Sequence, residues 1–159
     1  MELAYDIYAD TNPAFCAAVL AEFCNSHSKT IGVPPSLIVV YPVLPLAMSE
    51  DLAGTFEQTN HATGLMSWLH RSPHIREDLA KRINRTLQIT TTAVRFGCHV
   101  GILRLDNEGL LSANLKCVVP TYEKTRAVSE IVSRARLLGR WMAAAGSPRV
   151  IMEGFGVTV

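Results

Sequence analysis

The chain has 159 residues, enough for one domain whose hydrophobic core needs neither disulfides nor a structural metal. Its net charge at pH 7 is only +1, which excludes a global positive field of the kind that drives nonspecific nucleic-acid binding. Hydrophobic residues make up 48% of the chain and charged residues only 18%, so we expect apolar surface that either marks an obligate protein partner or belongs to an unusually apolar monomer.

The first predicted helix begins at Asn12-Pro13, because an Asn side chain caps free backbone N–H groups and Pro is favoured at the first helical position. Apolar residues at helical spacing extend it to about Cys24. Residues 25–35 are polar and rich in turn formers. Residues 36–46 are dense in β-branched side chains but contain two prolines, which predicts an edge strand or an extended buried segment that a partner covers.

Two short helices are predicted next, from Ser49 to about Gln58 and over residues 64–70. Pro73 starts a further helix, and its apolar stripe has a period of 3.6 residues. That stripe consists of Ile75, Leu79, Ala80, Ile83 and Leu87. The pattern then changes phase, so residues 90–100 are predicted as a separate helix that ends near Gly101.

A β-hairpin is predicted over residues 102–105 and 110–115, because turn-forming residues separate two short apolar runs. The order of helix, turn, helix and hairpin is typical of a winged helix. The longest predicted helix covers residues 123–145, and residues 148–159 form an apolar tail that is interpreted as a last strand. We therefore predict a single α+β domain over residues 1–159, mostly helical and winged-helix-like, with a long C-terminal helix.

The N-terminal residues 1–6 contain two acids and do not resemble a secretory signal. The longest apolar stretch, residues 37–48, is too short to span a bilayer and is interrupted by prolines. Four scattered cysteines are typical of reduced thiols in a cytosolic protein. We therefore expect a cytoplasmic protein that does not associate with membranes.

Local signatures of catalysis or of nucleotide binding are missing from the sequence, including a Gly-x-Ser-x-Gly elbow and a glycine-rich phosphate loop. Cys24-x-x-His27 supplies one pair of metal ligands, but no second pair follows. Cys98 and His99 are neighbours on a predicted helix and point about 100° apart. We therefore expect no enzyme activity, metal or cofactor, and a small hydrolase that uses Cys24 or Cys98 is the most distant alternative.

DNA binding is a sharper hypothesis, because cationic side chains lie on the predicted helix-turn-helix and on the hairpin. The candidate nucleic-acid contacts are Lys81, Arg82, Arg85, Arg95 and Arg104. However, the presumed recognition helix over residues 90–99 carries a single Arg, whereas base-reading helices expose several long polar side chains. The pattern therefore favours a protein-docking scaffold over a DNA reader.

A partner interface is the second hypothesis. Arginines of the final helix suit an acidic partner surface or nucleic acid, although a solvated face is the commonest reason for such a pattern. Trp is the residue type that anchors interfaces, and it equally often caps a core. The candidate partner residues are Val39, Tyr41, Arg136, Arg140 and Trp141.

Landmarks along nearly the whole chain carry a resemblance to one family. They are Asn12-Pro13-Ala14-Phe15, the proline-punctuated run over residues 34–45, Trp68-Leu69, Ala93-x-x-Phe96-Gly97, Leu138-Gly139-Arg140-Trp141-Met142, Ala145-Gly146-Ser147 and Gly156-Val157. In this order they resemble the small middle components of bacterial three-component ABC-ATPase systems, the group to which Lamassu-type anti-phage operons are related.

The resemblance implies a non-catalytic adaptor of an anti-phage defence complex. Its partners would be an SMC-like or Rad50-like ABC ATPase and an effector subunit, often a nuclease, with weak or indirect contact to DNA. It implies no catalytic residues. The alternative is a stand-alone winged-helix transcription regulator.

Overall fold

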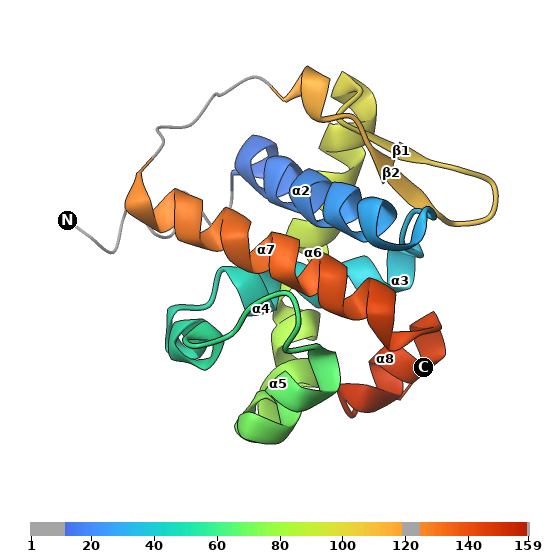
Figure 1. The fold of residues 1–159 in the computed structure, drawn as a ribbon. Coiled ribbons are helices and arrows are strands. Elements are labelled where there is room, and N and C mark those ends of the chain that lie inside the picture. The colour runs from blue at the N-terminus through green and yellow to red at the C-terminus, as the bar shows by residue number, and fades with distance from the viewer. Residues whose placement is uncertain (1–11, 119–124, 159) are drawn as a thin grey trace.

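The computed structural model describes residues 12–118 and 125–158, and most of these residues are helical (Figure 1). The helices are α2 (Pro13–Ile31), α3 (Leu37–Val40), α4 (Val43–Ala47), α5 (Leu65–Arg71), α6 (His74–Val100), α7 (Arg126–Ala145) and α8 (Pro148–Gly154). Two 3-10 helices, η1 (Glu50–Phe56) and η2 (Leu115–Cys117), and two strands, β1 (Leu103–Leu105) and β2 (Leu111–Ala113), complete the order. The predicted class, mostly helical with a hairpin before C-terminal helices, is confirmed.

The long helices form layers around α2 and α4. Helix α2 and the short α4 each contact both α6 and α7. In Figure 1, α7 crosses in front and α6 runs behind. The core therefore lies between α6 on one side and α7 on the other, with α2 and α4 in the middle.

Helix α2 begins where the sequence predicted. The Asn12 side-chain oxygen accepts hydrogen bonds from the backbone N–H groups of Ala14 (3.0 Å) and Phe15 (3.4 Å). The helix continues past Cys24 and ends at Ile31, followed by Gly32 in the left-handed conformation. Ser26 is buried, and its hydroxyl donates to the Arg136 carbonyl oxygen at 2.7 Å. This hydrogen bond lets the polar part of α2 pack against α7.

The predicted edge strand over residues 36–46 is wrong, because these residues form the short helices α3 and α4. Pro42 precedes the first residue of α4 and Pro45 is the third. The first N–H groups of a helix have no intrahelical partner, so proline costs no hydrogen bond at these positions. All five residues of α4 are buried, which explains the continuous apolar run.

The separate helices predicted within residues 73–100 are also wrong, because α6 is one continuous helix. The apparent change of phase arises because apolar Leu87 is 48% exposed, whereas polar Thr90 is fully buried in the helix's inner face. The exposed Ala80 departs from the predicted stripe as well. The helix-turn-helix predicted over residues 73–100 is therefore wrong, and its presumed recognition helix, residues 90–99, is the C-terminal part of α6.

The hairpin is confirmed, with Leu103 paired with Ala113 and Leu105 with Leu111. Asp106 builds the turn, since its carboxylate accepts hydrogen bonds from the backbone N–H groups of Glu108 and Leu110 at 2.9 Å. Gly109 adopts a φ of 78° in the same turn.

Helix α7 is confirmed, and Thr125 caps it by accepting a hydrogen bond from the Val128 N–H. The predicted start at Glu123 lies outside the described residues, as do residues 1–6 and the expectation that rests on them. The predicted last strand is wrong: residues 148–154 form α8, capped by the Ser147 hydroxyl. The side chains of Ile151, Met152 and Phe155 are buried, and their spacing is that of one helix face. In the sequence the same residues read only as an apolar run.

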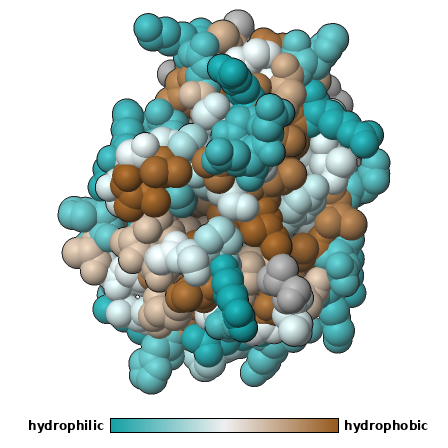
Figure 2. Space-filling view, turned by 90° about the vertical axis from the view of Figure 1, so that its right-hand side faces the viewer, coloured by the Kyte–Doolittle hydropathy of each residue, from teal (hydrophilic) through white to brown (hydrophobic). Residues whose placement is uncertain are grey.

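Part of the hydrophobic excess reaches the surface. Among the described residues, the large apolar side chains with more than a third of their area exposed are Ile31, Val33, Met66, Leu87, Val100, Leu105 and Val150. Figure 2 shows the face on the right of Figure 1, where the hairpin, α3 and α8 lie, and its apolar patches are separated by polar side chains. No single helix of the described chain is long and apolar enough to cross a membrane. The segments Leu37–Ala47 and Glu50–Phe56 together have the length and composition of a membrane span, but the chain bends by 99° between them.

Candidate partner interface

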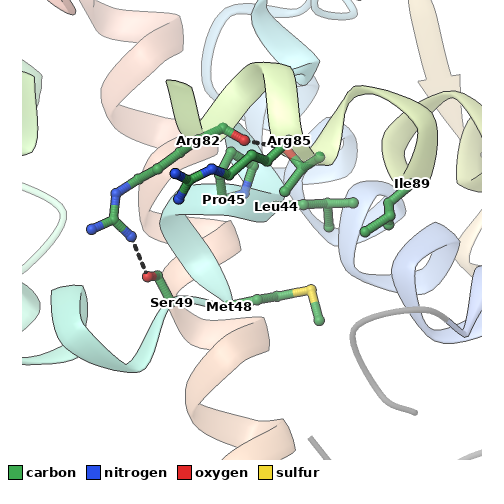
Figure 3. A pocket seen from close by; sticks show the side chains of 8 residues that line it. Leu44, Pro45, Met48, Ser49, Arg82, Arg85 and Ile89 are labelled. Atoms are coloured by element: carbon green, nitrogen blue, oxygen red, sulfur yellow. Dashed lines mark hydrogen bonds between the residues drawn. The ribbon is translucent and has the colours of Figure 1, made fainter. Parts of the chain in front are cut away.

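A groove of about 240 Å³ opens between α4 and α6 (Figure 3). It is lined by Leu44, Pro45, Met48, Ser49, Arg82, Arg85, Thr86 and Ile89. The four residues from α6 have the spacing i, i+3, i+4, i+7, which places them along one side of the helix. The floor is apolar and the α6 rim is basic, a combination that suits a polypeptide segment with mixed apolar and acidic side chains.

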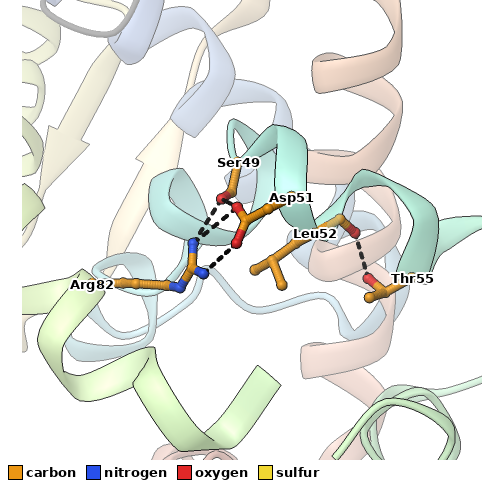
Figure 4. Close-up of polar contacts among 5 residues, drawn as sticks. All are labelled: Ser49, Asp51, Leu52, Thr55 and Arg82. Carbon is orange, nitrogen blue, oxygen red and sulfur yellow. Dashed lines mark hydrogen bonds and ion pairs between the residues drawn. The ribbon is translucent and has the colours of Figure 1, made fainter. Parts of the chain in front are cut away.

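Arg82 is held in place at one end of this groove (Figure 4). Its guanidinium donates to the Ser49 hydroxyl at 2.8 Å and to both carboxylate oxygens of Asp51, while the Ser49 hydroxyl donates to Asp51. These hydrogen bonds, first that from Arg82 and then that from Ser49, lower the pKa of Asp51 from 3.8 to about 2. The hydrogen bond to Asp51 in turn raises the pKa of Arg82. The pair therefore stays ionised and ties α6 to η1.

Replacing Asp51 with Asn is expected to reduce the free energy of unfolding at pH 7 by less than about 1 kcal/mol, because the Asp51 side chain is 60% exposed and water screens the pair. The pKa of Asp51 is lower in the folded state, so its stabilisation is fully present above pH 4 and is lost as the pH falls towards 2. The difference in urea midpoint between the wild type and Asp51→Asn should therefore shrink between pH 4 and pH 2. A difference that stays constant over this range would contradict the role of the ion pair.

Arg85 is the second cation of the groove. It is exposed, and no ion pair or hydrogen bond of its side chain occurs within residues 12–118 and 125–158. In Figure 3 its guanidinium extends along the groove beside that of Arg82. Asp51 neutralises the charge of Arg82. The positive charge available to a ligand of the groove is therefore that of Arg85.

The structure divides the five candidate nucleic-acid contacts. Arg82 and Arg85 line the groove, whereas Arg95 and Arg104 are exposed on the C-terminal half of α6 and on β1, outside its lining. Lys81 is exposed and lies 3.8 Å from the Asp78 carboxylate. These side chains therefore do not form one continuous basic surface around the groove.

The five candidate partner residues are also divided. Val39 and Trp141 are each 1% exposed and belong to the core, so the structure corrects their assignment to a surface. Tyr41 is half-buried, and its hydroxyl shares a hydrogen bond of 3.1 Å with that of Thr91. Arg136 and Arg140 are exposed and line a second hollow, between α2 and α7.

Sequence reasoning missed most of the groove. Leu44, Met48 and Ile89 had appeared only as apolar residues, and the Ser49–Asp51–Arg82 cluster joins residues more than 30 positions apart. The one local signal is Ser49, at which the sequence predicts the start of a short helix. Nothing in the sequence pattern placed that start beside Arg82.

Two of the residues considered for catalysis or metal binding, Cys24 and His27, are buried, whereas Cys98 is exposed. Burial raises the pKa of the Cys24 thiol well above its usual range, so this thiol stays protonated and is a poor nucleophile. Burial lowers the pKa of His27, and its Nδ1 donates to the Val33 carbonyl oxygen at 3.0 Å. Within the described part of the chain, no three His, Cys, Asp or Glu side chains gather as metal ligands.

Comparison with known proteins identifies one family. The ABC-three component (ABC-3C) system Middle Component 3 family matches residues 3–159. The curated proteins and the solved structures with which the chain was compared include no significant match. The match to this family model confirms the family that the sequence landmarks resemble. Because the match covers almost the entire chain, the protein belongs to the ABC-3C system Middle Component 3 family and is a component of a multi-protein system.

Proposed function

We propose that this chain is a non-catalytic adaptor of a cytoplasmic anti-phage defence complex, in which it bridges an SMC-like or Rad50-like ABC ATPase and an effector subunit such as a nuclease. The observation that carries the proposal is the match of residues 3–159 to a family of middle components. Membership implies association with other ABC-3C components, and bridging is the role that suits a small chain between two larger ones.

The layered fold supports a bridging role. The groove between α4 and α6 belongs to the α6 side of the core, and the hollow between α2 and α7 belongs to the α7 side. Figure 3 shows α7 behind the groove, in agreement with Figure 1. Two separate surfaces allow two partners to bind without competing for the same side chains.

The chemistry of the groove supports docking of a polypeptide. Leu44, Met48 and Ile89 offer apolar contact area, and Arg85 offers an unpaired positive charge. A partner segment with apolar side chains and one carboxylate would satisfy both. Burial raises the pKa of the Cys24 thiol, which makes this one residue a poor nucleophile.

The proposal is tested by co-producing the chain with each protein encoded beside it, followed by size-exclusion chromatography. We expect the chain to co-elute with the ATPase and, separately, with the effector. Arg85→Glu should weaken one of these two complexes and leave the other unchanged, whereas Arg76→Glu, at another exposed arginine of α6, should affect neither. Elution of a folded chain apart from both proteins would contradict the adaptor role, and a lone species that shifts labelled duplex DNA in a salt-dependent way would favour the transcription regulator instead.

A further inference from the structure

A second hollow, of about 520 Å³, lies between α2 and α7. Four residues from α2 line it, at spacing i, i+3, i+4, i+7: Glu22, Asn25, Ser26 and Lys29. The α7 side consists of Ser133, Arg136, Leu137 and Arg140, and Leu115, Asn60 and His61 complete the rim. Its walls are thus two long helices rather than loops.

The walls are fixed by close packing of the two helices. At Gly139 an added Cβ atom would lie 2.6 Å from the Phe23 carbonyl oxygen, so the backbones of α7 and α2 approach closely there. The Ser26 hydroxyl donates to the Arg136 carbonyl oxygen at 2.7 Å within the same crossing. The cationic side chains of the hollow therefore extend from a rigid base.

The hollow has an excess of positive charge. The Arg136 guanidinium lies 2.9 Å from the carboxylate of Glu22, which is the one acid among the described residues of the lining. Lys29 and Arg140 are exposed and make no ion pair or side-chain hydrogen bond within the part of the chain that the structure describes. Two uncompensated cations thus face the same hollow, in a chain whose total net charge is only +1.

We propose that this hollow binds an acidic segment of another ABC-3C component, with carboxylates opposite Lys29 and Arg140. The inference rests on the proposed function, because it names one of the surfaces through which the adaptor would bind. Charge complementarity supports it, and Leu115 and Leu137 add the apolar contact that polypeptide interfaces use.

Nucleic acid fits the hollow less well. Among the described residues that line it, His61 supplies the one aromatic ring and no Phe, Tyr or Trp is present, whereas single strands bind by stacking successive bases on several aromatic rings. Two unpaired cations also fall short of the roughly 6–10 phosphate contacts typical of duplex binding. An acidic protein segment is therefore the occupant that the lining favours.

The test uses the full chain and the component that co-elutes with it, and compares two double variants with the same change in net charge. Lys29→Glu/Arg140→Glu reverses the hollow, and Arg95→Glu/Arg104→Glu reverses two exposed cations elsewhere. We expect the first pair to raise the Kd of one complex at least about tenfold and the control pair to change it less than twofold. Raising NaCl from about 0.1 to 0.5 M should weaken the wild-type complex more than the complex of the hollow variant. Salt screens the attraction between the two cations and the partner's carboxylates, and the variant lacks that attraction.

The outcomes separate the two proposals. If components bind the wild type and both double variants equally, the hollow does not bind an acidic segment, although the adaptor role stands. If no component binds the wild type, both proposals fail. If 20-base-pair duplex DNA bound the wild type and not the hollow variant, the occupant would be nucleic acid and the proposal would be wrong. If the wild type self-associated and the hollow variant did not, the occupant would be a second copy of this chain, and the proposal would again be wrong. If Lys29→Glu/Arg140→Glu unfolds, the neutral variant Lys29→Gln/Arg140→Gln takes its place. An unchanged melting temperature then shows that this variant is folded.

Discussion

Replacing Trp141 with Ala is expected to lower the free energy of unfolding by about 3–5 kcal/mol. Trp141 is 1% exposed and packs in an aromatic cluster, with its ring centroid 6.1 Å from that of Phe56 and 5.4 Å from that of Trp68. Its indole N–H also donates to the Asn60 carbonyl oxygen at 2.9 Å. Truncation would leave a large cavity where α7 meets η1 and α5, and urea unfolding monitored by circular dichroism measures its cost.

Leu87→Ala is the matched control, because Leu87 is a large apolar residue that is 48% exposed, so its truncation should cost less than about 1 kcal/mol. Trp141→Phe keeps part of the ring packing and should fall between the two. If Trp141→Ala instead left stability unchanged and weakened binding to another component, the original surface interpretation of Trp141 would be right and its core assignment wrong.

Gly139→Ala is expected to lower the free energy of unfolding by about 2 kcal/mol. Ala is normally favoured over Gly inside a helix by about 1 kcal/mol. At this position, however, the new Cβ would lie 2.6 Å from the Phe23 carbonyl oxygen and 2.9 Å from the Ser26 Cβ. Backbone atoms of α2 cannot give way as a flexible side chain would, so the overpacking cost of about 1–3 kcal/mol is expected at its upper end.

Gly54→Ala provides the comparison, because no described atom beyond the local backbone lies within 4 Å of a Cβ built at Gly54. It should leave stability within about 0.5 kcal/mol of the wild type. Thermal or urea unfolding of the two variants therefore isolates the helix crossing. Equal stability of Gly139→Ala and Gly54→Ala would show that α2 and α7 are not as closely packed as described.

Elements defined by local chemistry could be predicted from the sequence. Asn12-Pro13 starts α2 through a side-chain cap, and Asp106 with Gly109 builds the hairpin turn within five residues. In these cases the sequence neighbours are also the physical partners. The capped helix start and the hairpin turn, which contains one glycine, therefore needed no tertiary information.

Elements whose identity depends on burial could not be predicted in the same way. The run over residues 36–46 has the composition of a strand, but burial all around α4 stabilises a short helix whose early positions tolerate Pro42 and Pro45. Thr90 is polar yet fully buried, which hid the continuity of α6. Tertiary packing overrides local propensity in both segments.

The candidate surfaces were predicted only in part. Arg82, Arg85, Arg136 and Arg140 were singled out as cations, and each of them lines a groove or a hollow. Their surroundings were out of reach, because Asp51 meets Arg82 and Glu22 meets Arg136 only after the chain folds back on itself. Lys29 was missed because the sequence predicts that the first helix ends near Cys24, whereas α2 continues to Ile31.

The most direct test of the adaptor role is the composition of the complex with and without this chain. The ATPase and the effector encoded beside it are co-produced, and the masses of the eluting species are measured by size-exclusion chromatography with light scattering. We expect one species that contains all three proteins when the chain is present, and separate ATPase and effector peaks when it is omitted. An ATPase–effector complex that forms equally well without the chain would contradict the account.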